Sequence, residues 1–231
     1  MRLPFLTSFL LFIIILSVQM KRNERKEDEL KKSFWDRELA ANSVRKKDIE
    51  SLPYIQFDPS SIPAHTELGD ERVNEYLAEL SSLSGKRILN CTGKSNTDLK
   101  LEYGAPNITK LTEYDGNYTI LVRSLARLAE KYLIHSAGNL ENISTDSGAS
   151  EAGNITGQQS QQLRDDALKI LEYGISVGTD VRLNYELLAR LYMEAGNRAG
   201  VKKLKESAES INSLSKEPIL RMLDRTLDQD S

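Results

Sequence analysis

The chain has 231 residues, of which 39% are hydrophobic and 28% are charged, and its formal net charge is −3. This length suits one domain with an attached segment, and the hydrophobic content is sufficient for a folded core. The slightly acidic balance excludes a general nucleic-acid binder, because such proteins carry an excess of Lys and Arg.

The first predicted element is an apolar run at residues 3–20, LPFLTSFLLFIIILSVQM, which contains no charged residue. As a helix it would reach ~27 Å, close to the ~30 Å of a bilayer's hydrocarbon core. The alternative is a cleaved signal peptide, whose apolar region is shorter and precedes a small-x-small cleavage site. The run ends instead in SVQMKR. We therefore predict an uncleaved anchor that contacts the lipid bilayer through residues 3–20.

The orientation of this anchor follows from the basic residues on either side. Arg2 and the α-amino group precede it, whereas Lys21, Arg22, Arg25 and Lys26 follow it. Basic residues favour the cytoplasmic side. The predicted localisation is the cell membrane, single-pass, with the rest of the chain in the cytoplasm.

A mixed-charge segment follows the anchor. Residues 21–50 hold ten basic and eight acidic residues, and their apolar residues have helical spacing, so we predict a juxtamembrane helix over about 23–47. Prolines at positions 53, 59 and 63 then interrupt helical structure. We predict that residues 51–69 are extended and lie over a helical body.

Helical periodicity returns at residues 70–83, where Val73, Tyr76 and Leu80 share one face. A short helix capped by Asn96 or Thr97 should end at Gly104. We expect Gly116 to break the next helix and Asn117 to begin another. Five asparagines stand in N-x-S/T sequons: Asn90, Asn107, Asn117, Asn142 and Asn154. Such an asparagine can accept a glycan or cap a helix. We favour capping for Asn107 and Asn117.

Residues 136–162, SAGNLENISTDSGASEAGNITGQQSQQ, contain no Lys, Arg or aromatic residue. This composition is typical of a disordered segment. Four amphipathic segments follow, and alternating strand patterns are absent. The predicted fold class is all-α.

A repeat links the two sides of this polar stretch. The residues LARL occur at 125–128 and at 188–191. Steps of 34 residues from Val201 and Ala208 reach the small residues Ala167 and Gly174, and steps from Tyr185 and Leu188 reach Ile219 and Met222. The residues predicted to pack the repeats are Leu125, Ala126, Leu128, Ala167, Leu171, Gly174, Tyr185, Leu188, Ala189, Tyr192, Gly196, Val201 and Ala208.

This spacing resembles the tetratricopeptide repeat (TPR) family over roughly residues 117–227. The resemblance implies a TPR-like α-solenoid of antiparallel helix hairpins, in which stacked repeats share one core. Lys205 departs from the family pattern where a large apolar residue is usual, and Thr179 departs where proline is usual. The alternative is a generic helical bundle.

The repeat also assigns the polar stretch to an insertion. The two LARL copies begin 63 residues apart, which exceeds one period by about the length of the stretch. A long loop costs little closure entropy. The predicted organisation is an anchor at 1–20, a charged juxtamembrane helix at 21–50, an extended segment at 51–69, and a helical-repeat domain at 70–231 with a disordered insert at 136–162.

The chain as a whole resembles a group of uncharacterised membrane-anchored repeat proteins from clostridial Gram-positive bacteria. The segments that carry this resemblance are FWDRELAANSVRKKDIESLPYI, NCTGKSNTDLKLEYGAPNIT and YDGNYTILVRSL. The resemblance implies a bacterial protein on the cytoplasmic face of the membrane, and it implies no activity.

We predict no catalytic, cofactor or metal site. The TGKS at 92–95 lacks the upstream glycine of a phosphate-binding loop. Cys91 is the single cysteine, so it forms no internal disulfide, and neither His65 nor His135 stands beside it in a motif. These three residues do not form a spaced metal-ligand set.

The favoured function is a scaffold that binds a protein or peptide partner in a concave groove. Candidate partner-binding residues come from the first helix of each repeat: Arg127, Asn184 and Arg190. The alternative is a helical enzyme or envelope-stress component without a recognisable motif.

Overall fold

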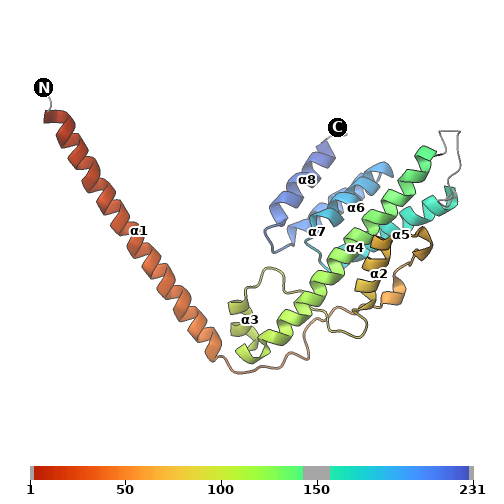
Figure 1. Cartoon of the computed structure of the whole chain (residues 1–231), viewed down its shortest axis with the longest axis horizontal. Coiled ribbons are helices and arrows are strands. Elements are labelled where there is room, and N and C mark those ends of the chain that lie inside the picture. Colours follow the sequence, from red (N-terminus) through yellow and green to blue (C-terminus); the bar gives the residue numbers. More distant parts are fainter. Residues whose placement is uncertain (1–2, 143–156, 229–231) are drawn as a thin grey trace. The chain divides into compact units, whose positions relative to one another are not determined.

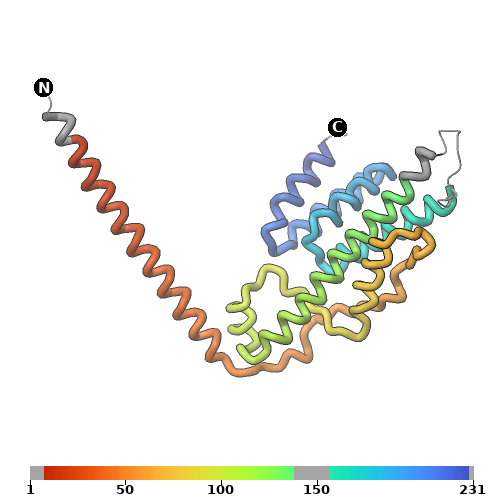
Figure 2. The backbone as a smooth tube through the Cα atoms, viewed as in Figure 1, coloured from red at the N-terminus to blue at the C-terminus, as the bar shows by residue number. Residues whose placement is uncertain are grey.

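The computed structural model describes residues 3–142 and 157–228, and it describes side chains at residues 8–137 and 157–228. Helices and turns make up these residues, which include no β-strand (Figures 1 and 2). The prediction of an all-α chain is confirmed.

The first helix, α1 (Leu3–Ser43), runs without a break through the predicted anchor and most of the juxtamembrane segment. In the part of the chain that is described, none of the helices combines the length and apolar character needed to cross a membrane. Residues 3–7 of the predicted anchor have side chains outside the described part.

The chain divides into two compact units, residues 1–50 with 94–109, and residues 51–93 with 110–231. The first unit contains α1, α3 (Asn96–Tyr103) and the 3-10 turn η3 (Ala105–Asn107). Glu38 of α1 accepts hydrogen bonds from Thr97 and Lys100 of α3. These bonds hold the pKa of Glu38 below its ordinary value. Residues 94–109 were predicted to belong to the helical-repeat domain, but they pack on α1.

Two predicted cap assignments in this unit are wrong. Ser95 caps α3, through a capping box with Asp98. Asn107 does not cap the helix that follows it, because its buried Oδ1 accepts no hydrogen bond. Its Nδ2 donates to the carbonyls of Lys47 and Tyr103, at 2.8 Å each. The bond to Lys47 ties the turn to the segment that follows α1.

The second unit holds α2 (Glu71–Ser81), most of α4 (Ile108–Asn142), α5 (Gly157–Ser176), α6 (Arg182–Glu194), α7 (Arg198–Glu209) and α8 (Lys216–Asp228). Consecutive helices from α5 to α8 contact one another, and α6 also contacts α8. Arg164 near the start of α5 pairs with Glu194 at the end of α6, and Arg198 at the start of α7 donates to Leu227 near the end of α8. These contacts show that both pairs of helices run antiparallel.

The helix break predicted at Gly116 does not occur, since α4 continues from Ile108 to Asn142. A glycine inside a helix costs only ~1 kcal/mol, and the helix on both sides of it is held by buried residues such as Leu111 and Leu121. Asn117 is no helix cap, because its amide donates to the carbonyl of Arg87. The amide therefore joins α4 to a segment 30 residues earlier in the chain.

The edges of the predicted insert are helical. Residues 136–142 belong to α4, and residues 157–162 belong to α5. The buried Ser160 hydroxyl donates to the buried Ser136 carbonyl at 2.6 Å, which joins the two helices where the insert leaves them. Both flanks of the polar stretch thus belong to one folded unit. Residues 143–156, the rest of the predicted insert, lie outside the described residues.

Residues 51–69 lie over the helices of the second unit, as their apolar side chains indicate. The Ile55 N–H donates to the Ile88 carbonyl, and Phe57 stacks on Tyr173 with 6.1 Å between ring centroids. Two 3-10 turns, η1 (Pro59–Ser61) and η2 (Thr66–Leu68), shape the segment. The predicted extended segment is therefore interrupted by short helical turns.

The residues chosen from the repeat spacing gather in the core of the second unit. Eleven of the thirteen are buried, Tyr192 is partly buried, and Gly196 has a φ of +68° in the turn between α6 and α7. Among the largest buried side chains are Tyr118, Tyr132 and Tyr185. Burial of each large apolar side chain contributes about 1.5–3 kcal/mol. Most of these positions are therefore buried in the second unit.

Candidate functional site

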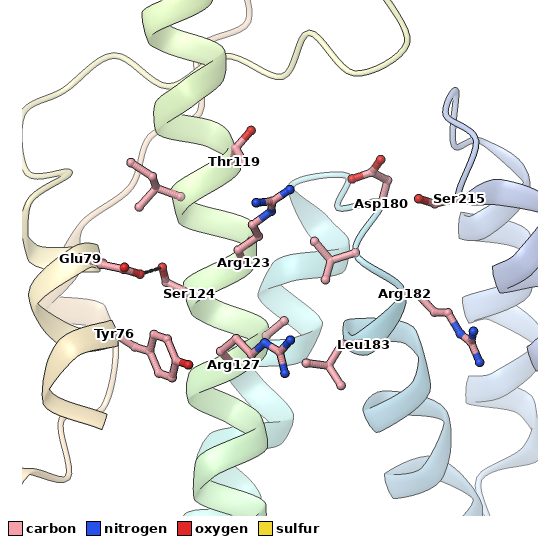
Figure 3. A pocket seen from close by; sticks show the side chains of 13 residues that line it. Tyr76, Glu79, Thr119, Arg123, Ser124, Arg127, Asp180, Arg182, Leu183 and Ser215 are labelled. Atoms are coloured by element: carbon pink, nitrogen blue, oxygen red, sulfur yellow. Dashed lines mark hydrogen bonds between the residues drawn. The ribbon is translucent and has the colours of Figure 1, made fainter. Parts of the chain in front are cut away.

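A groove opens on the second unit between α2, α4, the start of α6 and the residue before α8. It encloses about 720 Å³. Arg123 and Arg127 extend into it from α4, and Tyr76 and Glu79 face it from α2 (Figure 3). The full lining consists of Tyr76, Glu79, Thr119, Ile120, Arg123, Ser124, Ala126, Arg127, Asp180, Val181, Arg182, Leu183 and Ser215.

Helix α2 is held against α4 by the carboxylate of Asp70. This side chain accepts the N–H of Arg72 and so caps α2. It also lies 3.0 Å from Lys131 Nζ and 2.9 Å from His135 Nε2 on α4. Hydrogen bonds from His135 and Lys131 hold the pKa of Asp70 well below its ordinary value. The contacts fix the wall that carries Tyr76 and Glu79.

The opposite wall begins at the turn between α5 and α6. Tyr118 on α4 donates to the Gly178 carbonyl at 2.7 Å, and Tyr185 on α6 donates to the Thr179 carbonyl at 3.0 Å. The Thr179 hydroxyl accepts the Val181 N–H. Thr179, which departs from the repeat pattern by replacing a proline, therefore closes this turn through its hydroxyl. The turn places Asp180 and Arg182 at the groove.

Part of the groove lining is apolar. Val181 and Leu183 are partly buried, whereas Ala126 is fully buried. Ile120 remains 38% exposed although it lies on a helix of the core. Such a mixture of apolar surface and a few charged groups is common where proteins bind ligands or peptides.

The three predicted partner-binding residues do not lie together. Arg127 lines the groove. Asn184 is wrong as a groove residue, because it is fully buried and donates to the Leu171 carbonyl of α5 at 2.9 Å. Arg190 lies outside the groove lining, and its Nε is 3.9 Å from Glu194. Sequence reasoning missed Arg123, although its spacing of four residues from Arg127 places both on one helix face.

A second polar cluster surrounds His65. Its Nδ1 lies 2.8 Å from Glu67, its Nε2 lies 3.0 Å from the buried Asp166, and its ring packs edge-on against Tyr132. Burial raises the pKa of Tyr132 to about 12, so its hydroxyl stays protonated and donates to the Pro63 carbonyl. Both ring nitrogens of His65 have carboxylate partners. The arrangement is that of a structural clip between the 51–69 segment and helices α4 and α5.

The other residues considered from the sequence, Cys91 and the TGKS segment, make contacts that stabilise the fold. Cys91 is buried, and its N–H donates to Asp115. Gly93 forms a turn with φ of +82°, Lys94 pairs with Glu102, and Ser95 caps α3, which accounts for TGKS. Within residues 3–142 and 157–228, no three His, Cys, Asp or Glu side chains gather as a metal site requires.

Comparison with protein-family models, with curated proteins and with solved structures found no match to this chain.

Proposed function

We propose that this protein is a membrane-anchored, TPR-like helical-repeat scaffold that binds a segment of a partner protein in the groove between α2, α4 and α6. The observation that carries the proposal is the origin of the lining residues. Most come from α4, from the start of α6 and from the residue before α8. These are the elements that the 34-residue period treats as first helices of successive repeats.

The packing of the later helices supports a repeat arrangement. Helix α6 contacts both α7 and α8, so a first helix touches its own partner and the first helix of the next repeat. Ile219, one period after Tyr185, is buried as Tyr185 is. In a stack of this kind each hairpin buries its neighbour's apolar face. The surface lined by first helices is then available for a partner.

The membrane part of the proposal rests on α1. From Phe9 to Met20 nearly every residue is a large apolar one, and these side chains are about half exposed on the isolated helix, from 44% to 60%. An exposed apolar surface of this extent needs a cover. We propose that the bilayer supplies it and that the basic residues after position 20 keep both units in the cytoplasm.

The binding function is tested by photo-crosslinking in cells that naturally contain the protein. Ile120, in the groove, is replaced by p-benzoylphenylalanine, and Ile134, an exposed isoleucine on the same helix outside the groove lining, is replaced in a matched control. We expect one discrete adduct from position 120 and none from position 134. Equal adducts from both positions, or no adduct from either, would overturn the proposed groove.

The topology is tested by cysteine labelling. Cys91 is a poor reporter because it is buried, so Leu214, which is 98% exposed, is changed to Cys in a Cys91→Ala background. With both units in the cytoplasm, we expect a membrane-impermeant maleimide to label this residue only after lysis. Labelling in intact cells would place the second unit on the outer side of the cell membrane.

A further inference from the structure

We propose that the partner segment in this groove is acidic, with carboxylate side chains on either side of an apolar side chain. This inference rests on the proposed function and specifies the chemistry of the partner. It is based on three features of the groove: the accessibility of its arginines, the hydrogen bonding and position of its two carboxylates, and the apolar side chains in its lining.

The arginines have guanidinium groups that a partner can reach. Arg123 and Arg127 stand one turn apart on α4, and both are exposed (Figure 3). Arg127 lies 2.9 Å from Glu130, and Arg182 lies 3.8 Å from Glu186, each on its own helix. Exposed pairs of this kind contribute only about 0–1 kcal/mol, so a partner carboxylate can replace them at little cost.

Arg123 stands out among the lining residues. Within the described part of the chain, no carboxylate forms an ion pair with it. Its guanidinium extends over the groove from the same face of α4 as Arg127. Two guanidinium groups one turn apart can each donate two hydrogen bonds to a carboxylate, in the bidentate geometry that arginine favours.

The two carboxylates that line the groove leave this pair accessible. Glu79 accepts a hydrogen bond from the Ser124 hydroxyl, which occupies one of its oxygens. Asp180 lies in the turn before α6, on the wall opposite α2 (Figure 3). Three arginines and two carboxylates line the groove, and Arg127 and Arg182 also pair with Glu130 and Glu186 on their own helices. Within the described residues, Arg123 is therefore the lining arginine without an ion-pair partner, and a lysine-rich segment would be repelled by its charge.

The apolar lining residues account for the side chain between the carboxylates. Ile120, which is 38% exposed, lies about one turn before Arg123 on α4. Val181 and Leu183 complete the apolar surface from the other wall. A volume of about 720 Å³ is within the range of ~300–1,000 Å³ that ligand clefts show. It holds a few side chains of an extended segment.

The test uses the full chain in lipid nanodiscs and three pools of fluorescein-labelled decapeptides. Each pool alternates Leu, Ile or Val with Asp or Glu, with Asn or Gln, or with Lys. We expect the acidic pool to bind most tightly. The double variant Arg123→Glu/Arg127→Glu should weaken that binding by about tenfold or more. Arg190→Glu is the matched control, because Arg190 and Arg127 have the same side-chain exposure of 56%.

The outcomes separate this inference from the proposed function. Equal binding of the neutral or Lys pool, or unchanged binding by the double variant, overturns the acidic assignment and leaves the groove as a binding site. Loss of acidic-pool binding in millimolar inorganic phosphate, with the neutral pool also unbound, indicates a small-anion site and overturns it too. Failure of every pool together with no adduct at position 120 overturns both proposals. Circular dichroism checks the fold of each variant, and Arg123→Gln replaces the double variant if that one unfolds.

Discussion

Changing Gly174 to alanine is expected to destabilise the second unit by about 1–3 kcal/mol, although alanine is the better helix former. Gly174 lies in α5 where α6 approaches. A Cβ atom added there would lie 2.5 Å from Asn184 Oδ1 and 3.1 Å from its Cγ. Contacts this short force one of the two helices to move.

Asn184 cannot move aside easily. It is fully buried, and its amide donates to the Leu171 carbonyl at 2.9 Å, one turn before Gly174. Rotation of the side chain would break this bond, and an unmade bond to a buried polar group costs about 1–3 kcal/mol. The methyl group therefore displaces α6 against α5, and α6 also carries one wall of the groove.

The measurement is urea unfolding followed by circular dichroism. The control is Gly116→Ala in α4, where an added Cβ has nothing within 4 Å. That change should stabilise the protein by about 0.5–1 kcal/mol, through helix propensity alone. In an Asn184→Ala background, Gly174→Ala should likewise become stabilising. If Gly174→Ala stabilises the wild-type protein as much as Gly116→Ala does, the close packing of α5 on α6 is wrong.

Gly174 and Asn184 show which part of the helix packing could be predicted from the sequence and which part could not. Gly174 was expected at a helix crossing because it lies one period before Ala208, and the structure buries it. Asn184 was predicted to line the groove because it lies on the predicted first helix of a repeat. Its burial depends on the glycine opposite it, which belongs to another helix. A single-helix pattern contains no information about that partner.

The helix boundaries differ from prediction for a similar reason. The apolar spacing over residues 70–83 predicted α2 correctly, because a helical face is a local signal. Gly116 and Asn117 gave an equally clear local signal for a break, but α4 continues through them. The Asn117 amide is satisfied by Arg87, far away in the sequence. Likewise, Ser136 and Ser160 have the composition of a linker in the sequence, but in the structure they join α4 to α5 through a hydrogen bond.

The groove was only partly accessible to sequence reasoning. Arg127 was identified, and its neighbour on the same face, Arg123, could have been found from helical spacing. Tyr76, Glu79 and Asp180 could not, because they reach the groove through the Asp70 contacts and the turn held by Tyr118 and Tyr185. The site depends on how the hairpins pack rather than on a motif.

Asp166 is a second residue whose replacement should strongly destabilise the protein. Its carboxylate is buried on α5 and accepts hydrogen bonds from Gln162 at 2.9 Å and Lys169 at 3.2 Å. His65 Nε2 lies 3.0 Å from it and brings the 51–69 segment onto the helices. We expect Asp166→Asn to destabilise the protein by about 2–3 kcal/mol at pH 7, because hydrogen bonds to charged groups contribute about 1.5–3 kcal/mol each. Asp165→Asn, an exposed neighbour, is the control and should change stability by less than ~0.5 kcal/mol.

The pH dependence identifies the charge as the cause. Burial raises the pKa of Asp166, but hydrogen bonds from Gln162, His65 and Lys169 together outweigh it and bring this pKa below its ordinary value. A lowered folded-state pKa gives stability that is fully present above the unfolded pKa of ~3.9 and is lost as the pH falls through the folded value. The difference in unfolding free energy between wild type and Asp166→Asn should therefore be constant above about pH 5 and shrink below about pH 4. Urea unfolding at pH 7, 5 and 3 measures it. A difference that stays the same at pH 3 would mean that Asp166 acts through its shape, and the clip would then hold the 51–69 segment without its charge.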